Sequence, residues 1–215
     1  MADEHRFTQP EIAAVYRAIH ERRDMRHFRS DPVAPEVLER LLDAAHHAPS
    51  VGFMQPWRFI RITKPELRQQ LHALVEVERL ATAEALGKRG NEFMKLKVEG
   101  ILNCGELLVV GLMEGREQHV FGRRTMPEMD LASASCAIQN LWLAARAEGL
   151  AVGWVSLFDP AALAQLLCMP SGSTPMAVLC IGHTDEFYEE PMLQTEGWRD
   201  RDPIERYLYE DKWES

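Results

Sequence analysis

A short charged cluster, Arg22-Arg23-Asp24-Met25-Arg26, offers the clearest chemistry in this sequence. Guanidinium groups bind phosphate and carboxylate through a rigid fork of donors, so three arginines this close together suit an anionic ligand. The single acid, Asp24, adds a group that can move a proton. A simpler interpretation is a solvated helix end, where arginines complement the helix dipole. The cluster alone does not separate the two.

Two other polar segments lie where predicted elements end. In the first, residues 49–57, proline and glycine favour an irregular loop while Ser50 and Gln55 offer hydrogen bonds. The second, residues 153–156, places Ser156 directly after a predicted strand. Taken alone, the first is equally compatible with a plain helix-to-strand connection, and Ser156 with a residue that caps a strand end.

The sequence gives little support for a metal site, a common nucleotide-binding or hydrolase motif, or a paired-cysteine site. The adjacent His46 and His47 point apart on a helix, and no third ligand follows at a recognisable spacing, so we expect no metal site. The sequence has no G-x-G-x-x-G, P-loop or G-x-S-x-G motif. Its four cysteines form no C-x-x-C pair and are expected to be reduced core residues of a cytoplasmic protein. They are Cys104, Cys136, Cys168 and Cys180.

Composition and charge restrict the partners. A chain of 215 residues with 46% hydrophobic content suits one domain, residues 1–215. The formal net charge of -9 argues against nucleic acid or an anionic membrane as a partner. The sequence shows no apolar run of membrane-spanning length and no signal peptide. We therefore expect a soluble, cytoplasmic protein whose arginine cluster binds a small anion.

Helical patterns place the cluster at a helix end. Residues 8–11 match a capping box, and apolar residues then recur at helical spacing, which predicts a helix ending near Glu21. Further helices are expected after Pro32, at 65–86, at 129–148 and after Asp159. The buried side of the long fourth helix is predicted to carry Leu131, Ile138, Leu141, Trp142 and Ala145.

Strand patterns occur in four places. Residues 58–63 alternate apolar and charged side chains, whereas 107–112 form a continuous apolar run, as expected for a strand inside a sheet. Residues 152–155 and 176–181 are two more predicted strands. The tail from 183 to 215 has little periodicity but many aromatic residues, so we expect it to pack on its own domain or on a partner subunit.

In this order, the segments resemble the nitroreductase-like flavoproteins, and more narrowly the BluB group, the 5,6-dimethylbenzimidazole synthases. The Ser-Val-Gly-Phe-Met-Gln-Pro-Trp string is the most specific of them, because ordinary nitroreductases usually carry an Asn-x-Gln-Pro-type loop there. The segments that carry the resemblance are Arg22–Arg26, Ala48–Trp57, Lys97–Ile101, Gln139–Gly149 and Gly153–Ser156.

The resemblance implies an α+β fold, with a central, mostly antiparallel sheet flanked by helices. It also implies an intertwined homodimer with two FMN sites across the interface, in which the tail 183–215 wraps around the partner subunit. Separately, a surface excursion at about 85–93 is our candidate lid. The implied reaction consumes reduced FMN and molecular oxygen, forms 5,6-dimethylbenzimidazole, the lower ligand of cobalamin, and releases erythrose 4-phosphate. With no nicotinamide motif visible, we expect NAD(P)H to act indirectly, through a separate flavin reductase that supplies the reduced FMN.

The resemblance also implies roles for individual residues. Asp24 and Ser156 match the two positions tied to flavin fragmentation: a carboxylate can shuttle protons, and a hydroxyl near flavin N5 can steer oxygen. The arginines match positions at the flavin phosphate and the pyrimidine side of its ring, where guanidinium groups suit anionic oxygens. The implied FMN-binding residues are Arg22, Arg23, Asp24, Met25, Arg26, Ser50, Val98 and Ser156.

The chain departs from the family pattern in two places. Residues 126–130 read Met-Pro-Glu-Met-Asp where Asn-Pro-Gln-Met-Asp is common, and residues 103–106 lack the usual Ala-Pro pair. Neither departure touches Asp24 or Ser156. Two alternatives stay open: an NAD(P)H-dependent nitroreductase or flavin reductase that recycles FMN, and a non-catalytic flavin-binding protein.

Overall fold

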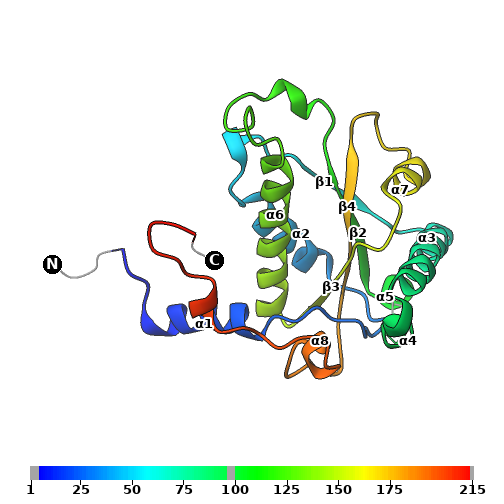
Figure 1. Ribbon diagram of the computed structural model, residues 1–215, viewed down its shortest axis with the longest axis horizontal. Coiled ribbons are helices and arrows are strands. Elements are labelled where there is room, and N and C mark those ends of the chain that lie inside the picture. The colour runs from blue at the N-terminus through cyan, green and yellow to red at the C-terminus, as the bar shows by residue number, and fades with distance from the viewer. Residues whose placement is uncertain (1–4, 96–99, 214–215) are drawn as a thin grey trace.

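The computed structural model describes residues 5–95 and 100–213, which form a four-stranded antiparallel sheet with helices on both faces (Figure 1). The strand order is β1-β2-β4-β3. Every residue of β2 is buried, which explains why its sequence is a continuous apolar run. The strands are β1 Trp57–Arg61, β2 Glu106–Leu112, β3 Ala151–Val155 and β4 Thr174–Gly182.

Helices cover the two faces of the sheet and enclose two apolar cores. One core lies against α2 (Pro35–His46) and α6 (Met129–Ala147), and the other against α3 (Pro65–Ala85), α5 (Gly100–Asn103) and α7 (Pro160–Leu166). The two groups stand on opposite sides of the sheet in Figure 1. The predicted α+β fold, an antiparallel sheet flanked by helices, is confirmed.

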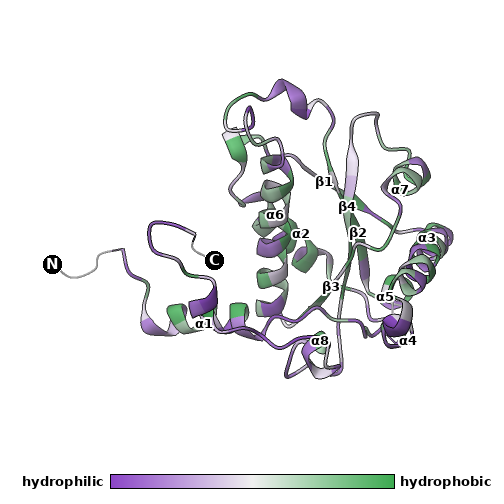
Figure 2. Cartoon of the chain, viewed as in Figure 1, coloured by the Kyte–Doolittle hydropathy of each residue, from purple (hydrophilic) through white to green (hydrophobic). Residues whose placement is uncertain are grey.

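The first helix, α1 (Gln9–Glu21), ends where the sequence predicts and lies on an arm that projects from the rest of the molecule (Figure 1). The Thr8 backbone N–H donates to the Glu11 carboxylate at 2.8 Å, as the capping box requires. No residue of α1 is buried. Its apolar residues, coloured green in Figure 2, therefore do not pack into a hydrophobic core within this chain.

Two expectations about the core are wrong in part. Leu131 is 45% exposed because the buried stripe of α6 runs through Asp130 and Ala134, and Leu131 lies about 100° away around the helix. All four cysteines are free, but Cys136 and Cys168 are exposed. Isolated apolar residue types do not specify which side of an element faces inward.

Two surface segments have short helices. The predicted lid region holds η2 (Gly87–Arg89) and α4 (Gly90–Phe93), which pack on α3, and its role as a lid stays a prediction. The tail holds α8 (Met192–Thr195) and η4 (Ile204–Arg206). The remaining short helices are η1 (Val51–Phe53) and η3 (Arg116–Gln118). In the described parts of the chain, no helix is both long and apolar enough to cross a membrane.

Candidate active site

The charged cluster lies on the edge of the sheet. Asp24 forms a single parallel bridge with Val152 of β3, and the Met25 backbone N–H donates to the Val152 carbonyl at 3.0 Å. Gly153 permits this close approach, because a Cβ there would lie 2.3 Å from the Met25 carbonyl oxygen. The Met25 side chain is fully buried. The cluster is thus anchored to β3 rather than being only a solvated helix end.

Asp24 and Arg26 together bind the backbone N–H and C=O of one residue of β3, Trp154. One Asp24 carboxylate oxygen accepts the Trp154 backbone N–H at 2.9 Å, and the other accepts Arg26 Nη2 at 2.5 Å. Arg26 Nη1 also donates to the Trp154 carbonyl at 3.2 Å. The side chain of Asp24 is still 39% exposed, so a ligand can reach it.

The electrostatic surroundings of Asp24 favour proton exchange. Burial raises the pKa of Asp24 above its ordinary value, although the Arg26 charge, the Trp154 N–H and the Arg22 charge oppose that rise. The carboxyl group therefore keeps its proton to a higher pH than an ordinary aspartate. A carboxyl group that is easier to protonate than an ordinary aspartate suits general acid–base chemistry.

Arg23 and Arg22 have different surroundings. The Arg23 guanidinium turns inward and donates to the carbonyl oxygens of His20, Arg22 and Glu189 at 2.7, 2.8 and 2.5 Å. Its own carbonyl accepts Trp142 Nε1 at 3.1 Å. These donors are occupied by main-chain acceptors, so Arg23 mainly holds the segment in place in this chain.

Arg22 keeps its donors free of hydrogen bonds to the described residues and lies over the Trp142 ring, 4.7 Å from its centroid. Partial burial lowers the pKa of Arg22, and the nearby Arg23 and Arg201 charges lower it further, against the attraction of Asp24. Crowded cations of this kind favour a bound anion. Arg201 carries no signal of its own in the sequence, since it lies in the aperiodic tail.

Ser156 is exposed and follows β3 directly, two residues after Trp154. Along an extended chain that spacing is about 7 Å, and it brings both side chains to the same side of the backbone. Trp154 in turn packs near Trp142, with their ring centroids 6.3 Å apart. Asp24, Ser156 and two indole rings therefore lie in one region at the end of β3.

Ser50 lies elsewhere in the chain. Its hydroxyl accepts the Gln55 backbone N–H at 3.0 Å, and the adjacent Val51 N–H donates to Ser133 of α6 at 3.0 Å. Ser133 precedes Trp142 by nine positions, or about 14 Å along the helix axis. One chain therefore holds the Ser50 loop and the arginine cluster at opposite halves of α6. Val98, the other predicted contact, lies outside the described residues.

The residues at the end of β3 fit a flat, anionic group such as FMN. Arg22 and Arg201 have no hydrogen-bonding partner among the described residues and suit a phosphate. The indole rings offer apolar surface, while Asp24 offers a carboxylate at the exposed edge. By contrast, no group of three or more metal-ligating side chains lies together in the described part of the chain.

Comparison with known proteins identifies the family. The family model described as the nitroreductase family matches residues 19–183, from the end of α1 to just beyond β4. This chain belongs to the nitroreductase family. The match includes every residue of the charged cluster and Ser156, whereas most of the tail lies outside it.

Two curated relatives are similar over most of their length. The 5,6-dimethylbenzimidazole synthase of Rhodospirillum rubrum is 41% identical, over 85% of this chain and 87% of its own. The 5,6-dimethylbenzimidazole synthase of Rhodobacter capsulatus is 38% identical, over 93% of this chain and 97% of its own. Among solved structures, oxidized iodotyrosine deiodinase bound to FMN and 3-iodo-L-tyrosine shares the fold, with a TM-score of 0.72 at 20% identity, over 93% of this chain and 99% of its own.

Proposed function

We propose that this protein is a 5,6-dimethylbenzimidazole synthase, which fragments reduced FMN with molecular oxygen and releases erythrose 4-phosphate. The observation that carries the proposal is Asp24, a partly exposed carboxylate held between the Trp154 N–H and Arg26 at the end of β3. Relatives of that name at 38–41% identity over most of the chain support it.

Different residues of this chain would bind the flavin and transfer protons to it. Arg22 and Arg201 would bind its phosphate, and the indole rings of Trp142 and Trp154 would lie against its apolar parts. When bound, reduced FMN supplies both the electrons that activate oxygen and the carbon atoms of the product.

Asp24 would act as the proton carrier. Arg26 and the Trp154 N–H fix its orientation, and its raised pKa makes the carboxylate easier to protonate. Ser156 would place a hydroxyl near the reacting part of the ring. Because no nicotinamide-binding motif is visible, we propose that reduced FMN comes from a separate flavin reductase and that NAD(P)H acts only through it.

The direct test supplies reduced FMN and oxygen and follows both flavin and product by mass spectrometry. We expect loss of FMN with matching formation of 5,6-dimethylbenzimidazole. Full recovery of oxidised FMN would contradict the proposal. Rapid NADPH oxidation with a nitroaromatic acceptor would favour a nitroreductase, whereas unaltered bound FMN under both conditions would favour a non-catalytic flavin-binding protein.

The variant Asp24→Asn tests the role of the carboxylate. It keeps the shape and one acceptor oxygen but cannot carry a proton, so we expect FMN binding within about threefold of wild type and product formation lower by roughly 100-fold or more. Asp43→Asn, on an exposed carboxylate of α2, is the matched control. Product formation at the wild-type rate in Asp24→Asn would make Asp24 a structural residue.

A further inference from the structure

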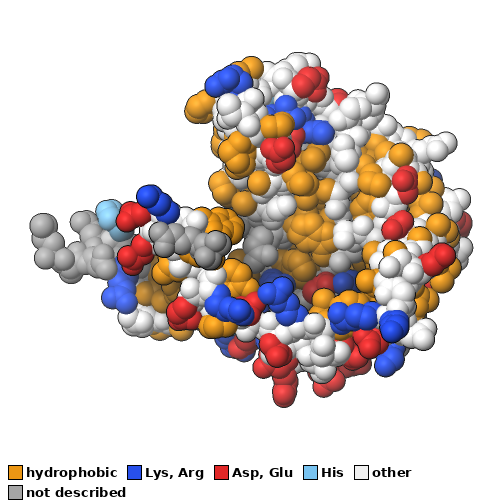
Figure 3. Space-filling model, in the orientation of Figure 1, with side chains coloured by type: hydrophobic (Ala, Val, Ile, Leu, Met, Phe, Trp, Pro, Cys, Tyr) orange, Lys and Arg blue, Asp and Glu red, His pale blue; other side chains and the backbone are white. Residues whose placement is uncertain are grey.

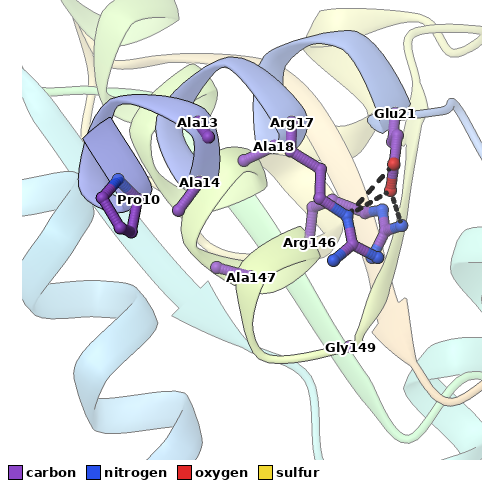
Figure 4. A pocket seen from close by; sticks show the side chains of 9 residues that line it. All are labelled: Pro10, Ala13, Ala14, Arg17, Ala18, Glu21, Arg146, Ala147 and Gly149. Atoms are coloured by element: carbon purple, nitrogen blue, oxygen red, sulfur yellow. Dashed lines mark hydrogen bonds and ion pairs between the residues drawn. The ribbon is translucent and has the colours of Figure 1, made fainter.

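Three consecutive tail residues contact three different parts of the region around the charged cluster. The ring of Phe187 packs under the Arg146 guanidinium, 4.3 Å from its centroid, and Arg146 is ion-paired with Glu21 at the end of α1. Figure 4 shows that ion pair where α1 meets the end of α6. The Glu189 carbonyl accepts Arg23 Nη2 at 2.5 Å. The tail segment 187–189 therefore lies directly against the segment that carries Asp24.

Between these two contacts, the Tyr188 hydroxyl holds the next part of the cluster. It accepts the Arg26 backbone N–H at 3.3 Å and lies 2.7 Å from His27 Nδ1. A phenol offers one donor and acceptor lone pairs, so a single hydroxyl can serve both neighbours. Tyrosine phenols are neutral at physiological pH and can do both, and burial raises the pKa of Tyr188 further above its ordinary value.

The Arg26 backbone is held by few other contacts. The adjacent Met25 N–H donates to the Val152 carbonyl of β3, whereas the Arg26 N–H donates to the Tyr188 hydroxyl among the described residues. On the outer side, a pocket of about 530 Å³ borders Arg26, His27 and Tyr188, which leaves room for the segment to move in that direction. The Tyr188 hydroxyl is thus well placed to decide where Arg26 lies.

We propose that Tyr188 is a positioning residue for the reaction, acting through Arg26 on Asp24. The Arg26 backbone is set by the Tyr188 hydroxyl, and the Arg26 guanidinium contacts both the Asp24 carboxylate and the Trp154 carbonyl. Without the hydroxyl, Arg26 moves toward the adjoining pocket and Asp24 loses its fixed orientation. The inference rests on the proposed function for its catalytic consequence, but not for the structural link itself.

The structural link is tested first, in the flavin-free protein, by hydrogen exchange. Tyr188→Phe removes the hydroxyl and keeps the ring, so the Arg26 amide loses its acceptor; we expect its exchange to be roughly fivefold to tenfold faster, the equivalent of one hydrogen bond. Tyr209→Phe is the matched control, because Tyr209 is a tail tyrosine whose hydroxyl donates to Arg206 instead. Unchanged exchange at Arg26 in Tyr188→Phe would overturn the inference.

The catalytic consequence is tested with reduced FMN and oxygen in a single turnover. For Tyr188→Phe we expect oxidised FMN to bind within about threefold of wild type, because Arg22 and Arg201 are intact, while product formation falls on the order of tenfold and intact oxidised FMN accumulates instead. His27→Ala keeps the Arg26 contact and should lose less than Tyr188→Phe.

The two tests separate the possible failures. Product formation by Tyr188→Phe at the wild-type rate overturns the positioning role, as does an equal loss of product in Tyr209→Phe. If the wild-type protein makes no 5,6-dimethylbenzimidazole, the proposed function fails, and the exchange experiment still decides whether Tyr188 holds Arg26.

Discussion

The three arginines of the cluster have different partners, although their sequence spacing presents them as one group. Arg26 contacts Asp24, Arg23 donates to main-chain carbonyls, and Arg22 has no hydrogen bond to a described residue. A free guanidinium beside the Arg201 charge is the strongest anion site of the three. At the residue scale, we therefore propose Arg22 as the residue that binds the phosphate.

Arg22→Ala should weaken the binding of FMN more than the binding of riboflavin. We expect its dissociation constant for oxidised FMN to rise by roughly 10- to 100-fold, the loss of a charge-assisted contact of about 1.5–3 kcal/mol. Riboflavin, which lacks the phosphate, should bind with little change. Fluorescence titration of both flavins measures the difference.

Arg40→Ala is the control for charge alone, since Arg40 pairs with Glu148 at the surface and should leave both affinities unchanged. An equal loss of FMN and riboflavin affinity in Arg22→Ala would argue that Arg22 acts by packing on Trp142 rather than by binding the phosphate.

The helix α6 connects the two candidate regions at the scale of elements. Its first half holds the Ser50 loop through Ser133, and its second half holds the charged cluster through Trp142. In its first turn, the buried Asp130 carboxylate accepts Arg116 Nε at 2.8 Å and Arg123 Nε at 3.2 Å. These ion pairs hold the loop before α6 in place. Phe121 of that loop contacts Gly52. Asp130 thus stabilises the end of α6 that holds the Ser50 loop.

Asp130→Asn should be strongly destabilising. The Asp130 side chain is 7% exposed, so its neutralisation leaves the Arg116 and Arg123 charges without their carboxylate in a buried place. We expect the free energy of unfolding to fall by about 3 kcal/mol, as measured by urea denaturation. The exposed pair between Arg89 and Glu92 provides the control, because Glu92→Gln should change stability by less than about 0.5 kcal/mol. Equal effects of the two variants would contradict the importance of burial.

The whole molecule leaves large apolar surfaces uncovered in a single chain. Tyr16 of α1 and Trp213 of the tail are 57% and 86% exposed, and α1 has no buried residue. Figure 3 shows apolar side chains gathered on the hollow face between the projecting arm and the body. Exposed apolar surface of this kind marks interaction sites. We therefore expect a homodimer in which α1 and the tail are covered by the partner.

A homodimer would also bring Ser50 to the arginine cluster, which a single chain holds at the other half of α6. We expect mixed dimers of Asp24→Asn and Ser50→Ala chains to regain activity, because one of their two sites would then contain both native residues. An isolated mixed dimer has one native site of two, so its activity should be about half of that of the wild-type dimer.

Co-expression with two different affinity tags isolates the mixed dimers for this measurement. Activity no higher than that of the two single variants would place Ser50 and Asp24 in the same site of one chain, or would show that Ser50 takes no part. Size-exclusion chromatography of the wild-type protein provides the independent measure of its oligomeric state.

The sequence alone determined most of the elements and the family. The capping box at Thr8, the apolar periods of the helices and the buried run of β2 depend on residues close together in the chain, so local patterns suffice to predict them. The charged cluster and Ser156 were identifiable by residue type, position and resemblance. Their chemistry stays a proposal that the experiments above can test.

Only the tertiary structure decided how those residues are used. The bridge between Asp24 and β3, the inward turn of Arg23, the approach of Arg201 and the hold of Tyr188 on Arg26 all join segments far apart in the chain. The same holds for the exposure of Leu131, which depends on which stripe of α6 meets the sheet. Such contacts depend on chain topology and close packing, and a local pattern of residue types carries no information about either.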